Sequence, residues 1–307
     1  IDNILRLVYN FVIQILLLRI RSGGMFCFRT NILLLFPLLM TWHTAALARS
    51  EIDARQFIEQ CQLKDFGSDQ RSRLTMVLRD PSGNEKKSVY QRYWKAYSGP
   101  GDLAEKMLLF TEYPPDARGA AFMRWGYQSA SDKKAQHWIY LPELKKIRRL
   151  SVRDMADRFL GSELTYADIS SRGIDADTHS FVARRTVGPD NYVLIASTPK
   201  DADYLYSKRL HWFKLGKTWH DCVVARTDYY DHKKQLLKKQ YYNWQEISGV
   251  WLWREVLVEN VQSYRNSLFI VDHATVNTGL KDDYFVERTM RHSQISKIPG
   301  SIRLALQ

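Results

Sequence analysis

The stretch FLGSELTYAD, residues 159–168, holds the side-chain types that an acyl-transfer enzyme would use. Ser162 follows a glycine, Glu163 and Asp168 carry carboxylates, and Tyr166 lies close by. A serine nucleophile of this kind requires the pattern G-x-S-x-G on a turn from a strand to a helix. Ser162 lacks the second glycine, so we expect it to act as a cap or turn residue.

Other candidate residues show no spacing typical of a catalytic or metal site. The histidines that follow residue 48 form no H-E-x-x-H pattern; they are His137, His179, His211, His220, His232, His273 and His292. Paired acids occur only in predicted loops, and no glycine-rich phosphate loop is present. We therefore expect no enzyme activity, no metal and no cofactor.

Two features could instead support binding. Tryptophans lie on many predicted strands, namely Trp94, Trp125, Trp138, Trp212, Trp244, Trp251 and Trp253. Core packing explains most of them, although a barrel of this size can enclose one ligand. The second feature is the basic run KKIRR, residues 145–149. It is either a solvated edge or a contact for anionic head groups or an acidic partner.

The N-terminal region resembles a secretory signal that starts at Met25. Arg29 precedes the apolar run 32–40, and Ala46 and Ala48 form an A-x-A cleavage site. The apolar run is shorter than the about 20 residues that a membrane-spanning helix needs. The pattern predicts cleavage after Ala48 and export to the periplasm.

The alternative is a membrane anchor at residues 4–20, but Arg6 and Arg19 interrupt that stretch. Arg49 stands where a lipid-anchored lipoprotein would carry cysteine. We expect residues 1–24 to be an upstream mis-start, residues 25–48 a signal peptide, and residues 49–307 a single β domain.

The composition favours a partner that carries negative charge. The chain has 45 Lys and Arg against 33 Asp and Glu, a net charge of +12. Basic proteins meet nucleic acid, anionic lipid or acidic proteins, and the expected export argues against nucleic acid. Cys61 and Cys222 could pair in an oxidising periplasm or remain two buried thiols, because nothing in the sequence places them side by side.

Apolar periodicity predicts one helix followed by many strands. Residues 51–66 repeat apolar side chains near helical spacing, and a period of two dominates afterwards. In the second predicted strand, for example, Tyr90, Arg92 and Trp94 share one face. The strands follow one another through short turns, as in a meander.

One segment breaks this alternation. Val152, Met155, Phe159 and Leu160 repeat at three to four residues, which predicts a short amphipathic helix over residues 152–160 that ends at Gly161. Because open sheet edges are a liability, a long meander tends to curve or close. The predicted fold is mainly antiparallel β (α+β): an incomplete, half-open β-barrel of roughly ten strands, with helices covering its mouth.

Four stretches together resemble a known family: FLGSELTYADI, TPKDADYLYSKRLHWF, DYYDHKKQLLKKQYYNWQEISGVWLWREVLVEN and TVNTGLKDDYFVERTM. They are similar to the LolA-like family of outer-membrane lipoprotein-sorting proteins, over residues 55–292. The resemblance implies an incomplete antiparallel barrel whose helices close a hydrophobic cavity for acyl chains. This branch is broader than the lipoprotein carrier itself.

The leading hypothesis is a periplasmic carrier or chaperone that binds a lipidated or hydrophobic molecule in its cavity, for transfer towards the outer membrane. Candidate cavity and lid residues are Leu74, Met76, Leu78, Met107, Leu109, Met155, Phe159, Leu160, Leu252, Val256 and Val258. Candidate basic residues at the rim are Lys145, Lys146, Arg148 and Arg149.

The alternative is a non-carrier: an envelope scaffold or an accessory subunit of a lipid-exporting transporter, with a barrel filled by its own aromatic side chains. An open apolar cavity would favour the carrier, and a packed interior would favour the scaffold. Expected partners are a lipid or lipidated protein and a membrane transporter or outer-membrane acceptor. We expect a monomer.

Overall fold

The computed structural model describes residues 53–98, 100–128, 131, 133–151, 153–217 and 221–291. The chain divides into two compact units, residues 1–51 and 52–307, and every described residue belongs to the second. The expected mis-start, the expected signal peptide and its cleavage site after Ala48 lie outside the described residues.

The described residues form one sheet of thirteen strands, more than the roughly ten expected. The strands are β1 (Asp69–Arg79), β2 (Glu85–Ala96), β3 (Leu103–Tyr113), β4 (Ala121–Tyr127), β5 (Gln136–Leu141), β6 (Lys146–Arg149), β7 (Asp177–Val187), β8 (Asp190–Pro199), β9 (Lys208–Leu215), β10 (Cys222–Tyr230), β11 (Leu236–Ile247), β12 (Val250–Asn260) and β13 (Arg265–Val276).

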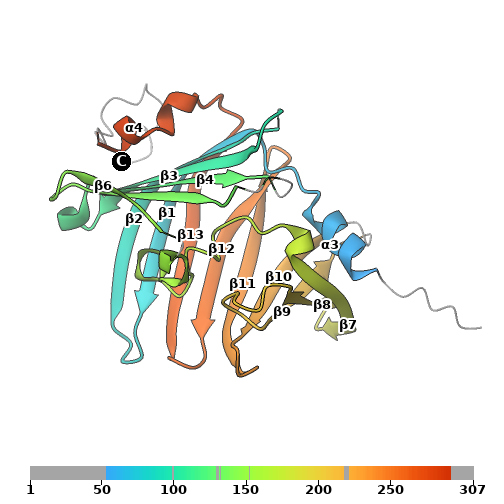
Figure 1. Ribbon diagram of the computed structural model, residues 1–307. Coiled ribbons are helices and arrows are strands. Elements are labelled where there is room, and N and C mark those ends of the chain that lie inside the picture. The colour runs from blue at the N-terminus through green and yellow to red at the C-terminus, as the bar shows by residue number, and fades with distance from the viewer. Residues whose placement is uncertain are drawn as a thin grey trace, which may run out of the picture. The chain divides into compact units, whose positions relative to one another are not determined.

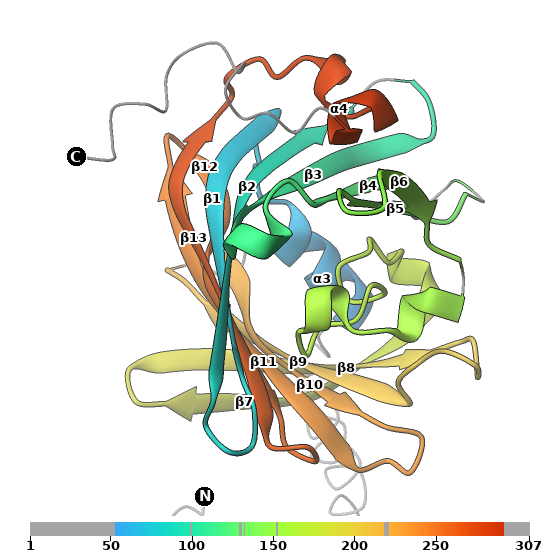
Figure 2. The same cartoon turned by 90° about the vertical axis from the view of Figure 1, so that its left-hand side faces the viewer.

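The sheet is antiparallel and open. Its order is β6-β5-β4-β3-β2-β1-β13-β12-β11-β10-β9-β8-β7, so β6 and β7 are the two edges. The first and last strands of the chain pair in its middle (Figure 1). Figure 2 shows the sheet bending so that one face is concave. The mainly antiparallel β architecture is therefore confirmed, as an open sheet and not a closed barrel.

Helix α3 (Ala54–Gln62) confirms the predicted first helix, although it ends at Gln62 and not at Phe66. The Asp53 carboxylate caps it by accepting a hydrogen bond from the backbone N–H of Gln56 at 3.0 Å. Its buried stripe of Ala54, Phe57, Ile58 and Cys61 packs on Val193, Ile195 and Phe213 of β8 and β9. This end of the concave face is thus filled by one helix.

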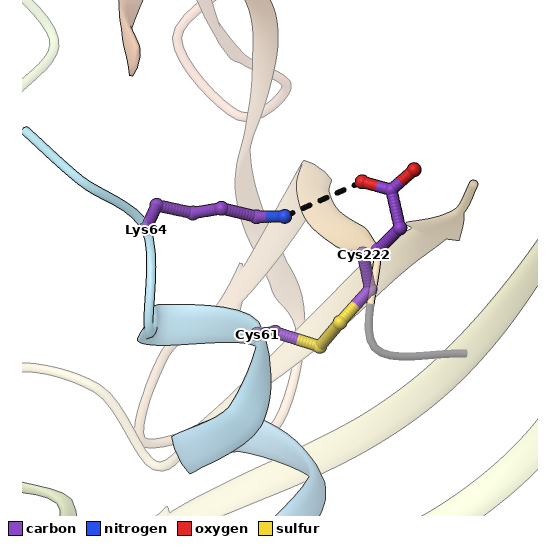
Figure 3. Close-up of a disulfide and its surroundings, with 4 residues drawn as sticks. Cys61, Lys64 and Cys222 are labelled. Atoms are coloured by element: carbon purple, nitrogen blue, oxygen red, sulfur yellow. Dashed lines mark hydrogen bonds and ion pairs between the residues drawn. A yellow bond between two sulfur atoms is a disulfide. The ribbon is translucent and has the colours of Figure 1, made fainter. Parts of the chain in front are cut away.

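A disulfide joins this helix to the sheet (Figure 3). Cys61 of α3 bonds to Cys222 at the start of β10, with the two Cα atoms 5.1 Å apart and a sequence separation of 161. Beside it, the Lys64 ammonium lies 3.4 Å from the Asp221 carboxylate. The sequence left this pairing open, and the fold brings the two cysteines together.

The predicted helix over residues 152–160 is wrong for the part that is described. Residues 153–176, here called the inner segment, form short 3-10 turns at Arg153–Ala156, Phe159–Gly161 and Ile174–Ala176. Leu160 and Gly161 adopt φ values of 50° and 81°, and a left-handed residue cannot continue a right-handed helix. The apolar spacing arises from successive turns, so the expectation of regular helices over the mouth is corrected to α3 plus an irregular segment (Figure 2).

The opposite, convex face has a cover of its own. The C-terminal stretch contains a 3-10 turn at Asp282–Tyr284 and helix α4 (Glu287–Arg291). Its side chains Leu280, Phe285 and Met290 are buried against the outward-facing side chains of β2 to β5, such as Tyr93 and Leu108. The C-terminal stretch therefore covers part of the convex face of the sheet.

Candidate functional site

A cavity of about 380 Å³ lies between the concave face and the inner segment. This volume falls in the range of about 300–1,000 Å³ typical of small-molecule sites. Successive residues of a strand point to opposite faces of the sheet, so every second side chain of a strand faces this wall. The apolar lining is Leu74, Met107, Leu109, Leu252, Val256, Phe269 and Val271 from the sheet, and Phe159, Leu164 and Ile169 from the inner segment.

The structure brings the sequence-predicted cavity residues into one apolar cluster, although not all of them reach the cavity. Those that line it are Leu74, Met107, Leu109, Phe159, Leu252 and Val256. Met76 and Val258 are buried in the surrounding core, and Leu78, Met155 and Leu160 pack against that core. Whether any of them contacts a ligand stays a prediction.

The predicted basic rim lies elsewhere. Lys145, Lys146, Arg148 and Arg149 lie in or beside the β5–β6 hairpin, and none of them is among the residues that line the cavity. The Arg149 guanidinium sits over the Trp138 ring at 5.8 Å, and Trp138 belongs to the convex cluster. This run therefore does not mark the mouth of the cavity.

Aromatic side chains form the wall near solvent. Phe66 and Trp253 line the cavity while remaining 37% and 38% exposed, so the cavity meets solvent beside them. Trp244 also lines it, with its ring centroid 6.3 Å from each of those two rings. A wide aromatic rim of this kind suits an apolar ligand with a polar end, because indole rings accept both surroundings.

Buried ion pairs hold the inner segment to the sheet. The Lys238 ammonium of β11 lies 2.5 Å from the Asp168 carboxylate, and it also donates to the Glu163 backbone carbonyl at 2.9 Å. The Glu163 carboxylate in turn accepts from Arg265 of β13 at 3.1 Å and from Asn260 at 2.9 Å. The inner segment is thus held by these polar contacts as well as by its buried side chains Phe159 and Leu164.

Ser162 has a local structural role, as its sequence context predicted. It is fully buried, and its hydroxyl accepts a hydrogen bond from the Leu164 backbone N–H at 3.2 Å. Its own N–H donates to the Phe159 carbonyl at 2.9 Å. These contacts of Ser162 are those of a turn residue.

Three charged residues line one side of the cavity, and sequence reasoning did not select them. Arg92 of β2, Glu105 of β3 and Arg124 of β4 all contribute to the wall. The Glu105 carboxylate accepts from Arg124 Nη2 at 2.5 Å, from Trp94 Nε1 at 2.5 Å and from Ser171 Oγ at 2.8 Å. Burial opposes ionisation of Glu105, but these partners outweigh it and lower the carboxyl pKa.

Arg92 has no carboxylate partner among the described residues. Its Nη1 donates to Gln70 Oε1 at 2.9 Å and to Ser72 Oγ at 3.4 Å, both of which are neutral. Burial lowers the pKa of Arg92 to about 10, Glu105 opposes this change, and Arg124 adds to it. At neutral pH the guanidinium still carries its charge.

A signal for these residues existed in the sequence. Alternation placed Arg92 on the same face as Tyr90 and Trp94, which both turn out to face the concave side. The same period puts Arg124 two residues from Phe122, a concave core residue. A charged residue that shares one face of a strand with apolar residues is a candidate cavity residue. Alternation alone, however, does not tell which face of the strand is buried.

His137 of β5 connects the sheet to the inner segment. Its ring lies 5.8 Å from that of Phe122 and 6.0 Å from that of Tyr166, and its Nε2 is 3.3 Å from Ser170 Oγ. Burial, with a smaller contribution from the Arg124 charge, lowers the pKa of His137 to about 4. The ring is therefore neutral at neutral pH.

The described residues contain neither a metal-binding cluster nor a membrane-spanning helix. Within this part of the chain, no three His, Cys, Asp or Glu side chains cluster in a way that could hold a metal ion. The helices described for this chain include none with the length and apolar character needed to cross a membrane.

Known proteins share both sequence features and the fold. Residues 104–292 match a family model described as "uncharacterized protein". A DUF1329 family protein from Desulfovibrio piger superposes with a TM-score of 0.69 at 23% identity, covering 79% of this chain and 98% of that one. No curated protein matches the sequence.

Two further solved structures carry names related to lipoprotein sorting. A domain from Vibrio parahaemolyticus, assigned to outer-membrane lipoprotein sorting, has a TM-score of 0.68 at 21% identity, over 78% of this chain and 98% of its own. A LolA superfamily protein from Nitrosomonas europaea has a TM-score of 0.57 at 17% identity, over 77% and 98%. At such identities these likenesses establish the fold.

Proposed function

We propose that this chain, which belongs to the family matched over residues 104–292 and shares its fold with a LolA superfamily protein, is a periplasmic carrier of a lipidated or otherwise hydrophobic molecule. The cargo would occupy the cavity between the concave face and the inner segment, and it would be passed towards the outer membrane. A membrane transporter would serve as donor or an outer-membrane protein as acceptor.

The observation that carries this proposal is the open apolar cavity. Each CH₂ group moved from water into such a wall contributes about 0.8 kcal/mol. Several methylenes can therefore offset the loss of translational and rotational freedom on binding, which costs at least about 4 kcal/mol. Affinity of this kind needs no covalent step, so release can follow when a partner offers a better site.

The scaffold alternative requires an interior filled by its own side chains. Much of the concave face is indeed covered by α3 and the inner segment, yet space for a ligand remains between Leu109, Val256 and Phe159. That remaining space favours the carrier.

The proposal is tested by filling the cavity without burying a charge. Met107 lines the wall and is half-buried, so Met107→Trp should occupy ligand volume while the fold persists. The affinity for a fluorescent acyl probe, measured by titration, should fall by about tenfold or more. Leu144→Trp serves as the control, because Leu144 is 61% exposed on the β5–β6 turn.

Native mass spectrometry of gently purified protein provides the second measurement. A bound fatty acid, phospholipid or lipidated peptide is the expected result. A protein that is empty, and that also fails to bind the acyl probe at micromolar concentration, would contradict the carrier and support the scaffold.

A further inference from the structure

The charges at the cavity wall, together with Lys238, which pairs with one of them, sum to one positive charge. Four lining residues are ionisable: Arg92, Arg124, Glu105 and Asp168. Asp168 is already paired with Lys238, at 2.5 Å. Glu105 alone therefore faces both guanidinium groups, which leaves one positive charge in a buried and otherwise apolar wall.

Hydrogen-bond donors are unmatched at the same place. Arg124 is 6% exposed, and its Nε and Nη1 atoms have no acceptor among the described residues, because Glu105 receives only Nη2. Arg92 donates only to the neutral groups of Gln70 and Ser72. Buried guanidinium donors without acceptors are costly, so this cluster is suited to accept an anion from a ligand.

The register shows how such an anion would lie relative to an apolar chain. Arg124 is opposite Met107 on β3, and Arg92 is opposite Leu109. Both arginines thus adjoin side chains of the apolar wall, which continues to Leu74, Val256 and Phe269. A molecule with an oxyanion at one end and an alkyl chain at the other would match both parts.

We propose that Arg92 and Arg124 form a head-group subsite for an anionic, single-chain amphiphile, whose carboxylate or phosphate oxygens accept the free guanidinium donors. This inference rests on the proposed carrier function and specifies its substrate class. Guanidinium groups bind carboxylate and phosphate with paired, charge-assisted hydrogen bonds, which gives both affinity and orientation.

The test compares amphiphiles that share a chain and differ in head group. Dodecanoate, dodecyl phosphate and dodecan-1-ol are titrated by calorimetry at about pH 8, where a carboxylic acid is ionised. We expect at least one of the two anions to bind about tenfold or more tightly than the alcohol. The tighter of the two identifies the head group as carboxylate or phosphate.

Variants locate the preference. Arg92→Gln should reduce anion binding by about tenfold while leaving dodecan-1-ol unchanged, and Arg92→Lys should recover part of the loss. Lys146→Gln, on the exposed β5–β6 hairpin, is the matched control and should change neither. The comparison of ligands on the unaltered protein needs no variant, so it holds even if Arg92→Gln folds poorly.

The outcomes separate two failures. Equal affinity for the anions and the alcohol would overturn the head-group subsite and leave the carrier function standing. An effect of Lys146→Gln equal to that of Arg92→Gln would also overturn it, by moving the contact to the hairpin. Failure of all three amphiphiles to bind would overturn the carrier function and, with it, this inference.

Discussion

The two ends of the concave face are covered in different ways. Over β8 to β10, helix α3 lays a continuous apolar stripe on the sheet and a disulfide holds it there. Over β1 to β4 and β12 to β13, the inner segment crosses in short turns and is held by buried ion pairs such as Asp168 with Lys238. The cavity lies under the second cover.

The difference shows why only one end retains space. Helix α3 presents one continuous apolar stripe to the sheet, and its close-packed side chains fill the volume between them. Turns present their apolar side chains at irregular heights, and polar contacts at a few points fix their position. The cavity therefore lies at the end of the concave face whose cover, the inner segment, is attached at only a few points.

Removing the disulfide should have the largest effect on stability. The bond closes a loop of 161 residues, and loops of this size stabilise by about 4–5 kcal/mol through the unfolded chain. We expect Cys61→Ser combined with Cys222→Ser to lower the free energy of unfolding by about that amount in urea titrations. Acyl-probe affinity at low denaturant should stay the same, since the cavity lies at the other end; a matching loss of affinity would contradict the separation of the two ends.

Breaking the buried Asp168–Lys238 pair should have the second-largest effect on stability, and it should act on the inner segment. Asp168→Asn leaves the Lys238 ammonium buried without its carboxylate, which costs about 3–5 kcal/mol. The same change should speed probe entry, because the inner segment loses its attachment to β11. Asp175→Asn is the control: its pair with Arg55 is exposed, so the loss of stability should be much smaller. Unchanged stability of Asp168→Asn would show that the pair does not hold the segment.

Acid should weaken the inner-segment end progressively. The pKa of His137 is lowered from 6.5 to about 4, mainly by burial. Between those values the unfolded state binds more protons, so stability falls as the pH drops from about 6.5 towards 4. Urea midpoints across this range should decline less steeply in His137→Gln. Since His211 has its pKa lowered to about 3, also mainly by burial, some decline should remain. Identical slopes in both proteins would exclude His137 as the cause.

The smallest expected effect is that of Ser162→Ala. The substitution removes one hydrogen bond to the Leu164 backbone N–H, worth about 1 kcal/mol. Thermal unfolding should shift slightly, and acyl-probe binding should be unaffected. Complete loss of function on this substitution would contradict the turn role of Ser162 and reopen a chemical one.

Local periodicity was sufficient to predict most of the strands and helix α3, because each of these elements repeats its own pattern. Helix α3 and most strand positions follow from spacing alone. The inner segment was mispredicted because Met155, Phe159 and Leu160 have helical spacing while Leu160 adopts a left-handed conformation. The spacing of apolar residues along the sequence carries no information about the backbone angle φ at each of them.

The candidate site depended on information that lies between elements. Arg92 could be assigned to one face of its strand, but its place in a cavity follows from β1 pairing with β13 and from the inner segment that covers that face. The Cys61–Cys222 bond likewise joins residues that only the complete sheet brings together. Long-range pairing of this kind leaves no local periodic signal.

The pairing of β1 with β13 also sets the order in which the molecule can be assembled. Among the described strands, every other pair joins neighbours along the chain. A chain that emerges N-terminus first can therefore build β1 to β6 and then β7 to β13 as two separate half-sheets. Each half keeps an open strand edge until the last strand arrives, and such edges invite aggregation. The late closure of this one seam should make folding slow, since non-local contacts are the slowest to form.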